Sequence, residues 1–97
     1  MAVPDSTLMP LADARRITEY GPWLYRLFDD AGALLYIGKT VRLPVERLNG
    51  HWRKPWWAEV TQVSLERHRA DWVCLAAEVA AIKAERPRYN IRSAVPV

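Results

Sequence analysis

The feature that most constrains the fold is a pair of strand-like segments separated by a short turn signal. Residues 22–28 show the side-chain alternation of a strand and are rich in aromatic and large apolar residues. Residues 33–38 form a second apolar run. Between them stands Asp29-Asp30-Ala31-Gly32, whose residue types favour a tight bend. This pattern predicts a β-hairpin.

The register of the hairpin decides which side chains meet. If Phe28 pairs with Ala33, Tyr25 lies opposite Tyr36 and both phenols project from one face. A bulge at Gly32 would shift the register by one residue and separate them. Cross-strand tyrosines usually only pack together. A phenol has an ordinary pKa of about 10, so a tyrosine that acts as a base near neutral pH needs cations close by.

The rest of the chain predicts two helices, one more strand and an N-terminal extension. The extension is residues 1–20 with one short helix, and a domain follows over residues 21–97. The later elements are a helix from about Leu43 to Trp52 capped by Thr40, a strand over Val60–Arg67 and a helix over Ala70–Glu85 ended by Pro87. The predicted fold class is a small α/β (α+β) sandwich with a short three-stranded antiparallel sheet flanked by helices.

The last helix carries an apolar stripe made of Trp72, Leu75, Ala76, Val79 and Ile82. Such a stripe is typical of a helix face that packs on the core. Glu78 borders the stripe, so we expect its carboxylate to be partly buried. Similarly, Leu48 and Trp52 of the preceding helix are expected to point inward as an apolar pair.

Composition and charge limit the class of protein. The chain has 97 residues, 51% of them hydrophobic, which supports one compact core. Its net charge is only +3, but basic residues gather in two clusters, over residues 39–54 and 83–92, as in a phosphate-binding footprint. Cys74 is the single cysteine, which excludes an internal disulfide. Without a signal-like N-terminus or a membrane-length apolar run, we expect a cytoplasmic protein with no membrane partner.

Several polar residues behind the hairpin suit phosphodiester chemistry. Arg47 and His51 are four apart on a predicted helix and so share a face, where Arg can brace a phosphate and His can orient water or move its proton. Lys39 directly follows the second strand and is a candidate partner for a tyrosine hydroxyl. Each of these residues, alone, is more often an ordinary solvated side chain.

Glu78 and Asn90 complete the candidate site. One carboxylate completed by water and phosphate oxygens is ordinary for Mg²⁺, although a half-buried Glu is more often hydrogen-bonded. No second acid is well placed for a two-metal site, and no His/Cys spacing suits zinc. Asn90 follows Pro87; if the terminal segment returns to the sheet as a strand, its amide can position the backbone of the site or touch the phosphate.

The block that holds Trp52, Trp56 and Trp57 also contains Arg53 and Lys54. At least two of these Trp residues are expected to anchor the core. One exposed Trp among cations could instead stack on an unpaired base.

In their combined order these residues resemble the GIY-YIG nuclease family, over roughly residues 21–92. The family has a Tyr-bearing strand, a Tyr-Ile-Gly strand, a helical Arg with His or Tyr one turn on, a helical Glu and a late Asn. This chain offers Tyr25, Tyr36-Ile37-Gly38, Arg47, His51, Glu78 and Asn90 in that order. It departs from the family at Trp23-Leu24, where the family name has Gly-Ile.

The resemblance implies a catalytic set of Tyr25, Tyr36, Arg47, His51, Glu78 and Asn90. Glu78 would bind one divalent ion, Mg²⁺ or Mn²⁺, and Arg47 would stabilise the scissile phosphate. One tyrosine, assisted by His51 or Lys39, would activate water, and Asn90 would support the site. DNA contacts are assigned to Lys39, Arg42, Arg53, Lys54 and Arg88.

The implied function is a divalent-metal-dependent DNA endonuclease that nicks or selects structured substrates, such as branched or single-strand-containing DNA. Strong sequence specificity is not expected, because no helix-turn-helix or zinc finger fits residues 1–20. A recruiting protein or a second copy of the chain is a further partner to consider. Two alternatives stay open: a non-catalytic DNA-binding accessory protein with the same fold, and a protein-interaction module that uses the Trp-rich block. RNA cleavage, and repair, mobile-element and defence roles, also stay open.

Overall fold

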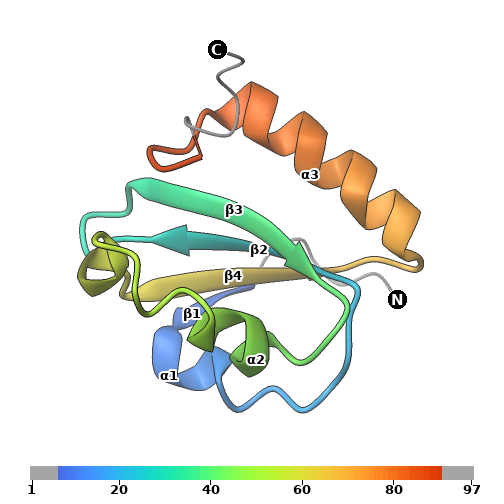
Figure 1. Cartoon of the computed structure of the whole chain (residues 1–97), viewed down its shortest axis with the longest axis horizontal. Helices are drawn as coiled ribbons and strands as arrows, with labels where there is room; N and C mark the ends of the chain where they lie inside the picture. Colours follow the sequence, from blue (N-terminus) through green and yellow to red (C-terminus); the bar gives the residue numbers. More distant parts are fainter. Residues whose placement is uncertain (1–6, 91–97) are drawn as a thin grey trace.

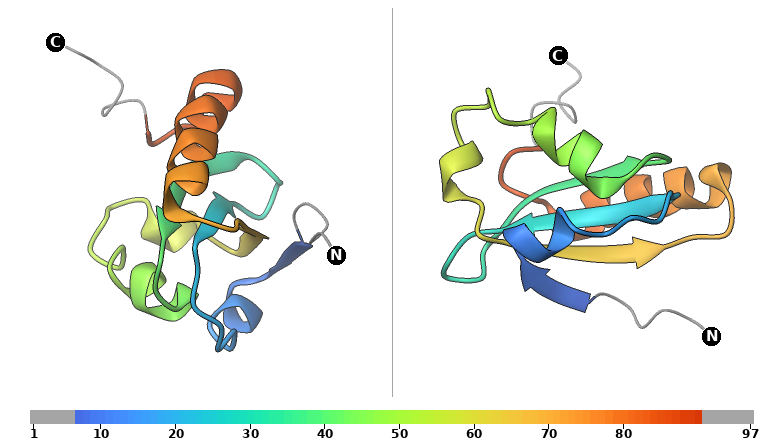
Figure 2. Two further views of the ribbon diagram at one scale, coloured as in Figure 1. Left: turned by 90° about the vertical axis from the view of Figure 1, so that its right-hand side faces the viewer. Right: turned by 90° about the horizontal axis from the view of Figure 1, so that it is seen from below.

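The computed structural model describes residues 7–90. Its elements are β1 (Thr7–Pro10), α1 (Leu11–Ala14), β2 (Trp23–Phe28), β3 (Leu34–Thr40), α2 (Pro44–Asn49), a 3₁₀ turn (Trp57–Glu59), β4 (Gln62–Arg67) and α3 (Asp71–Glu85). The strands form one antiparallel sheet in the order β1-β4-β2-β3. Helix α3 covers one face, and α1 and α2 lie on the other (Figures 1 and 2). The predicted α+β class is confirmed.

The sheet has four strands, so the prediction of three is wrong. The extra strand, β1, comes from the segment interpreted as an extension, and its Thr7–Pro10 pairs with Leu65–Gln62 of β4. The chain then turns into α1, whose Ala14 is fully buried in the core. A four-residue strand is too short to show a period-two pattern, and it becomes a strand only because β4 offers an edge. The domain boundary near residue 20 stays a prediction.

The predicted hairpin forms, but its register differs from the expected one. Tyr25 lies opposite Gly38, and Tyr36 lies opposite Leu27. Tyr25 and Tyr36 nevertheless project from the same face, with ring centroids 6.3 Å apart. The prediction of a shared face is therefore confirmed, and the prediction that the two tyrosines pair directly is wrong.

Two one-residue offsets explain this outcome. Phe28 pairs with Leu34 rather than Ala33, so the connection spans residues 29–33, and the carboxylate of Asp29 accepts hydrogen bonds from the N–H groups of Ala31 (3.0 Å) and Ala33 (2.8 Å). A β-bulge then leaves Leu35 without a partner on β2. Each offset alone would move Tyr36 to the other face, and together they restore it.

The sheet separates two apolar layers. Towards α1 and α2 the core contains large side chains, among them Trp23, Tyr25, Leu27, Leu48 and Trp56. Towards α3 the core is thinner and consists of Leu24 and Ile37 packed against Cys74 and Ala81. Tyr25 and Tyr36 therefore belong to the thicker layer, on the side opposite α3.

The extent of α3 agrees with its prediction, but the predicted buried face is wrong except at Ile82, which packs against the core. Trp72, Leu75 and Val79 are 69%, 47% and 60% exposed, whereas Cys74 and Ala81 are buried. The small side chains let the helix lie close to the sheet, and this close approach outweighs the burial of larger ones. Near the end of α3, Glu85 forms a bidentate pair with Arg26 of β2, at 2.9 and 2.7 Å, which holds the helix in this rotation.

Helix α2 is shorter than predicted and lacks the predicted cap. It ends at Asn49, and the residues that follow continue as turns. The Thr40 hydroxyl accepts a hydrogen bond from the Arg42 N–H at 3.0 Å, so it closes the loop before the helix instead. Leu48 is buried as expected, but Trp52 is 62% exposed, so the prediction of an inward apolar pair is wrong.

The last described residues, 88–90, are a turn rather than the start of a strand, and the rest of the predicted terminal segment, including Arg92, lies outside the described residues. Within residues 7–90 no helix has the length and apolar character needed to span a membrane.

Candidate active site

Tyr25 occupies the centre of the candidate site, and Gly38 makes room for it. The Tyr25 ring crosses β3 so closely that a Cβ added to Gly38 would collide with the ring and its hydroxyl. Glycine is therefore required here for close approach. Tyr25 is 1% exposed, and its position over the strand carries the hydroxyl towards the turn that follows α2.

The Tyr25 hydroxyl contacts two of the predicted catalytic residues. It lies 2.8 Å from His51 Nε2 and accepts a hydrogen bond from Arg47 Nε at 3.1 Å. Arg47 comes from the last turn of α2 and is exposed, while His51 comes from the next turn and is buried. The terminal nitrogens of Arg47 make no hydrogen bond to residues 7–90, so they remain open to an anion from solvent.

Tyr36 completes the aromatic wall of the site. Its ring centroid lies 4.9 Å from that of His51 and 5.3 Å from that of Trp56, and Trp56 stacks in turn on Tyr89 at 5.2 Å. Tyr36 is half-buried, and within residues 7–90 its hydroxyl has no hydrogen-bond partner. The stack fixes the ring and leaves the hydroxyl available.

Burial keeps both Tyr25 and His51 neutral near pH 7. It raises the pKa of Tyr25 above its ordinary value, and the opposing effect of Arg47 is smaller. Burial, followed by Arg47 and Lys54, lowers the pKa of His51 to about 4. The hydrogen bond between them thus joins a phenol to a neutral imidazole, whose Nδ1 is buried without a partner among the described residues.

Glu78 is the candidate metal ligand on α3. Its side chain is half-buried, and burial raises its pKa while Lys39 and Arg47 lower it. It makes no hydrogen bond or ion pair with any residue of the described range 7–90. A half-buried carboxylate left without a donor fits a cation.

The donor set also limits the kind of ion. Residues 7–90 contain no group of three or more His, Cys, Asp or Glu side chains arranged to hold a metal. An ion at Glu78 would therefore rely on water and phosphate oxygens for most of its ligands, which Mg²⁺ tolerates and structural zinc does not.

Asn90 acts on the backbone of β3. Its side-chain amide accepts a hydrogen bond from the Ile37 N–H at 2.8 Å and donates one to the Ile37 carbonyl at 3.0 Å. The N–H groups of Arg88 and Tyr89 bond the carbonyls of Leu34 and Leu35. Of the two roles considered for Asn90, the geometry supports positioning of the strand between Tyr36 and Gly38.

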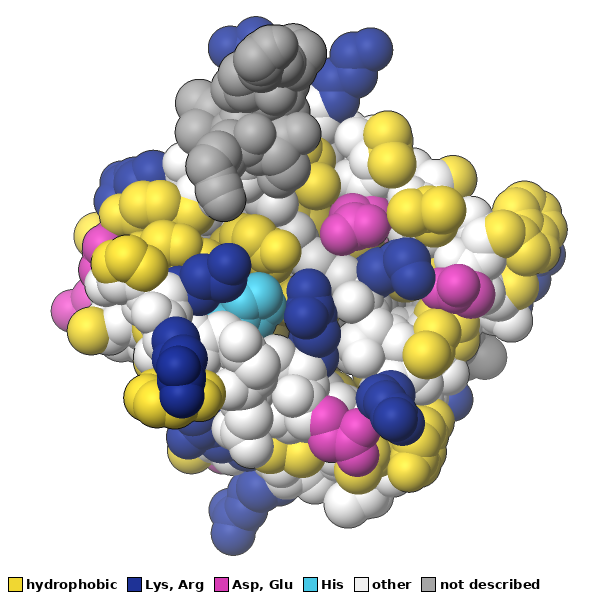
Figure 3. Space-filling model, viewed as in Figure 1, with side chains coloured by type: hydrophobic (Ala, Val, Ile, Leu, Met, Phe, Trp, Pro, Cys, Tyr) yellow, Lys and Arg dark blue, Asp and Glu magenta, His cyan; other side chains and the backbone are white. Residues whose placement is uncertain are grey.

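The cations predicted to contact DNA lie in different environments. Lys39 Nζ pairs with Asp71 at 2.7 Å, so its predicted contact with a tyrosine hydroxyl is not present. Arg42 and Arg88 form ion pairs with carboxylates: Arg42 Nε lies 3.6 Å from Glu46 Oε1, and Arg88 Nη1 lies 3.4 Å from Glu59 Oε1. Arg53 and Lys54 are exposed and have no carboxylate partner among residues 7–90. Figure 3 shows basic side chains around a histidine on one face, with acidic ones to the side.

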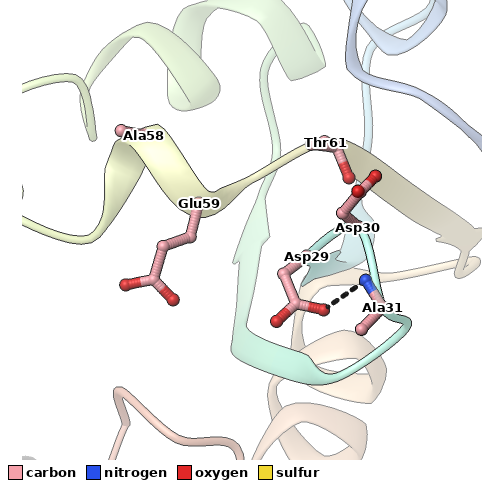
Figure 4. Close-up of a pocket in the computed structure, with 6 residues that line it drawn as sticks. All are labelled: Asp29, Asp30, Ala31, Ala58, Glu59 and Thr61. Carbon is pink, nitrogen blue, oxygen red and sulfur yellow. Dashed lines mark hydrogen bonds between the residues drawn. The ribbon is translucent and has the colours of Figure 1, made fainter.

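A hollow at the far end of the hairpin is separate from this site. It is lined by Asp29, Asp30, Ala31, Ala58, Glu59 and Thr61 (Figure 4). Three carboxylates line it, and they would repel a phosphate. The hollow therefore does not extend the candidate phosphodiester site.

Sequence analysis missed two residues that contribute to the candidate site. Asp71 holds Lys39, and Trp56 supports the Tyr36 ring. The Trp-rich block was a signal for Trp56, but nothing in it separates the Trp residue that packs from the one that stays exposed.

Comparison with known proteins gives one consistent similarity. No model of a protein family matches the chain. UvrABC system protein C is 30% identical over 78 residues in Legionella pneumophila and 36% over 78 residues in Neisseria gonorrhoeae, each over 72% of this chain. In Salinispora arenicola it is 31% identical over 80 residues, 73% of this chain. The chain spans 12% of the length of these relatives. It is thus similar to a small part of UvrABC system protein C.

Proposed function

We propose that the chain is a divalent-metal-dependent DNA endonuclease of the GIY-YIG kind that cuts one strand in each event. The observation that carries the proposal is the Tyr25 hydroxyl held between Arg47 and His51, with the unpartnered Glu78 carboxylate close enough to influence both Tyr25 and Arg47. The similarity to part of UvrABC system protein C, together with the resemblance described above, supports it.

Glu78 would hold Mg²⁺ or Mn²⁺, and the bound ion would neutralise charge on the phosphate. Arg47 would bind the same phosphate through its terminal nitrogens, because its Nε is already engaged by Tyr25. Asn90 would keep the β3 backbone, and with it Tyr36, in register. These roles assign one function to each polar group.

Water activation would use Tyr25 and His51 as a pair. A free phenolate is disfavoured, since burial raises the Tyr25 pKa. Instead, the water proton passes to the Tyr25 oxygen as the Tyr25 proton passes to His51 Nε2, 2.8 Å away. The water oxygen forms the new bond to phosphorus, the bond to the leaving oxygen breaks, and this oxygen takes up a proton from solvent. His51 is neutral near pH 7, since burial lowers its pKa to about 4, so its Nε2 is free to take the proton during the reaction.

A second candidate is a DNA-binding protein without turnover. It is favoured by one observation, the near-complete burial of Tyr25, which limits the access of water to its hydroxyl. Both candidates predict DNA binding, and only the first predicts cleavage that depends on Glu78.

The test is nicking of supercoiled plasmid by wild type and Glu78→Gln, each with Mg²⁺ and with EDTA. Gln keeps the size of the side chain and removes its charge, so we expect cleavage to fall at least about 100-fold while binding in a mobility-shift assay persists. Glu19→Gln is the matched control, because Glu19 is exposed and pairs with Arg67 at 3.5 Å, away from the candidate site, and we expect it to keep its nicking activity.

Full activity of Glu78→Gln, or of wild type in EDTA, would contradict the metal-assisted mechanism. Binding of plasmid and of branched DNA by wild type without any cleavage would favour the second candidate.

A further inference from the structure

We propose that Trp52 is a stacking platform for an unpaired base next to the cleaved bond, so that the chain prefers DNA with unpaired nucleotides there. The inference rests on the proposed function, because it assigns the substrate class of the same site. Of the three Trp residues in the block, Trp56 is buried in the core and Trp57 packs against it. Trp52 is 62% exposed.

The turn after α2 places the platform beside the catalytic residues. The His51 N–H bonds the Leu48 carbonyl, and the Lys54 N–H bonds the His51 carbonyl at 2.8 Å. This tight turn directs His51 inward to Tyr25 while the adjacent Trp52 faces solvent. Arg47, His51 and Trp52 thus come from one short segment, so a base on Trp52 would lie close to a phosphate bound at Arg47.

The surroundings of Trp52 suit a nucleotide. The guanidinium of Arg53 lies over the indole, 4.8 Å from the ring centroid. Neither Arg53 nor Lys54 has a carboxylate partner within residues 7–90, so both remain available to backbone phosphates. An aromatic surface with unpaired cations beside it is the arrangement by which proteins hold single-stranded nucleic acid.

The base on this platform has to be unpaired. Inside a duplex, neighbouring bases cover both faces of a base, and an indole on the protein surface reaches neither of them. A flap, a bulge or a strand junction presents a free face. Stacking would therefore favour such DNA over perfect duplex.

Trp72 is a matched comparison. It is 69% exposed and also has an arginine over its ring, with Arg69 at 5.8 Å. It lies on α3 next to Asp71, however, and not in the turn that carries His51. Chemistry alone would make the two indoles equivalent, so a difference between them would come from their positions relative to the site.

The first experiment measures binding of a labelled oligothymidylate of about 8 nucleotides by fluorescence anisotropy. All proteins carry Glu78→Gln, so that cleavage does not interfere. Trp52→Ala is expected to weaken binding roughly 5- to 150-fold, and Trp52→Phe to weaken it less, because a smaller aromatic ring remains. Trp72→Ala is expected to bind as the parent does.

The second experiment compares cleavage of a flapped duplex with that of the same duplex without the flap. The wild-type ratio is expected to exceed 1, to fall towards 1 in Trp52→Ala and to recover in part in Trp52→Phe. An unchanged ratio and affinity in Trp52→Ala, or an equal loss in Trp72→Ala, would overturn the proposal. If wild type cleaves nothing, the proposed function fails, and the binding experiment still decides whether Trp52 stacks on a base.

Discussion

The protonation states of Tyr25 and His51 depend on burial more than on neighbouring charges. Tyr25 lies over Gly38, and His51, in the turn that follows α2, is 2% exposed. Arg47 favours the ionised phenol, but desolvation has the larger effect on both pKa values. At the scale of residues, therefore, the pair is a hydrogen bond between two neutral groups, and the proposed activation of water needs no resting phenolate.

His51 should make stability depend on pH. Its pKa is about 4 in the folded chain, whereas an unfolded imidazole has a pKa of about 6.5. Between these values the unfolded chain binds a proton at His51 that the folded chain does not. The contribution of His51 to stability is therefore complete above pH 6.5 and is lost as the pH falls to 4. We expect the free energy of unfolding, measured with urea, to fall by about 2–3 kcal/mol across this window because of His51.

His51→Gln removes this titration and serves as the control, so its stability should vary less between pH 6.5 and 4. The comparison is needed because Glu78 contributes with the opposite sign: its raised pKa makes the folded chain the stronger proton binder. Parallel curves for the two proteins would contradict the assignment.

That several candidate residues lie together could be predicted from sequence, and their individual contacts could not. Spacing placed Tyr25, Arg47, His51 and Glu78 on elements that converge. The partner of Lys39 was expected to be a tyrosine and is Asp71 instead, because α3 begins beside the end of β3. Such a contact depends on how two elements meet, which no local pattern encodes.

At the scale of elements, α3 separates what local sequence determines from what packing determines. Its bounds follow from helix-forming residues before Pro87. Its rotation does not, because the helix has two apolar sides, one with large residues and one with small ones. The thin layer over Leu24 and Ile37 receives the side that carries Cys74 and Ala81, with Ile82 at its edge. The hairpin register depends in the same way on a bulge at Leu35 that no residue type announces.

Adjacent alanines in α3 test this rotation. Ala81 is 8% exposed and packs against the sheet, whereas Ala80 faces solvent. Ala81→Leu should lower the free energy of unfolding by about 1–3 kcal/mol through overpacking. Ala80→Leu should change it by less than about 0.5 kcal/mol, since the two residue types have similar helix propensity. Equal effects in urea unfolding would contradict the observed rotation.

At the scale of the whole molecule, the described chain contains one site built around Tyr25 and one candidate metal ligand, Glu78. As the proposed nuclease site, it would act on one strand at a time. Residues that join it come from β2, β3, α2, the turn after α2, and α3, so the site requires nearly the complete fold.

On supercoiled plasmid we therefore expect nicked circles to accumulate first and linear DNA to appear later, by a second independent event. A time course resolved on an agarose gel at several protein concentrations measures this order. Linear product without a nicked phase, at a rate that rises with the square of the protein concentration, would instead indicate that two copies act together.

The hydrogen bonds of Asn90 to Ile37 have a consequence for solubility. An outer strand with unpaired N–H and carbonyl groups is a template on which another chain can add, and such addition leads to aggregates. The Asn90 amide bonds Ile37 as the peptide group of a neighbouring strand would. The N–H groups of Arg88 and Tyr89 bond the β3 carbonyls just before it, so the chain itself occupies the outer side of β3. The same amide that keeps Tyr36 in place thus also hinders a second copy of the chain from adding a strand at this edge of the sheet.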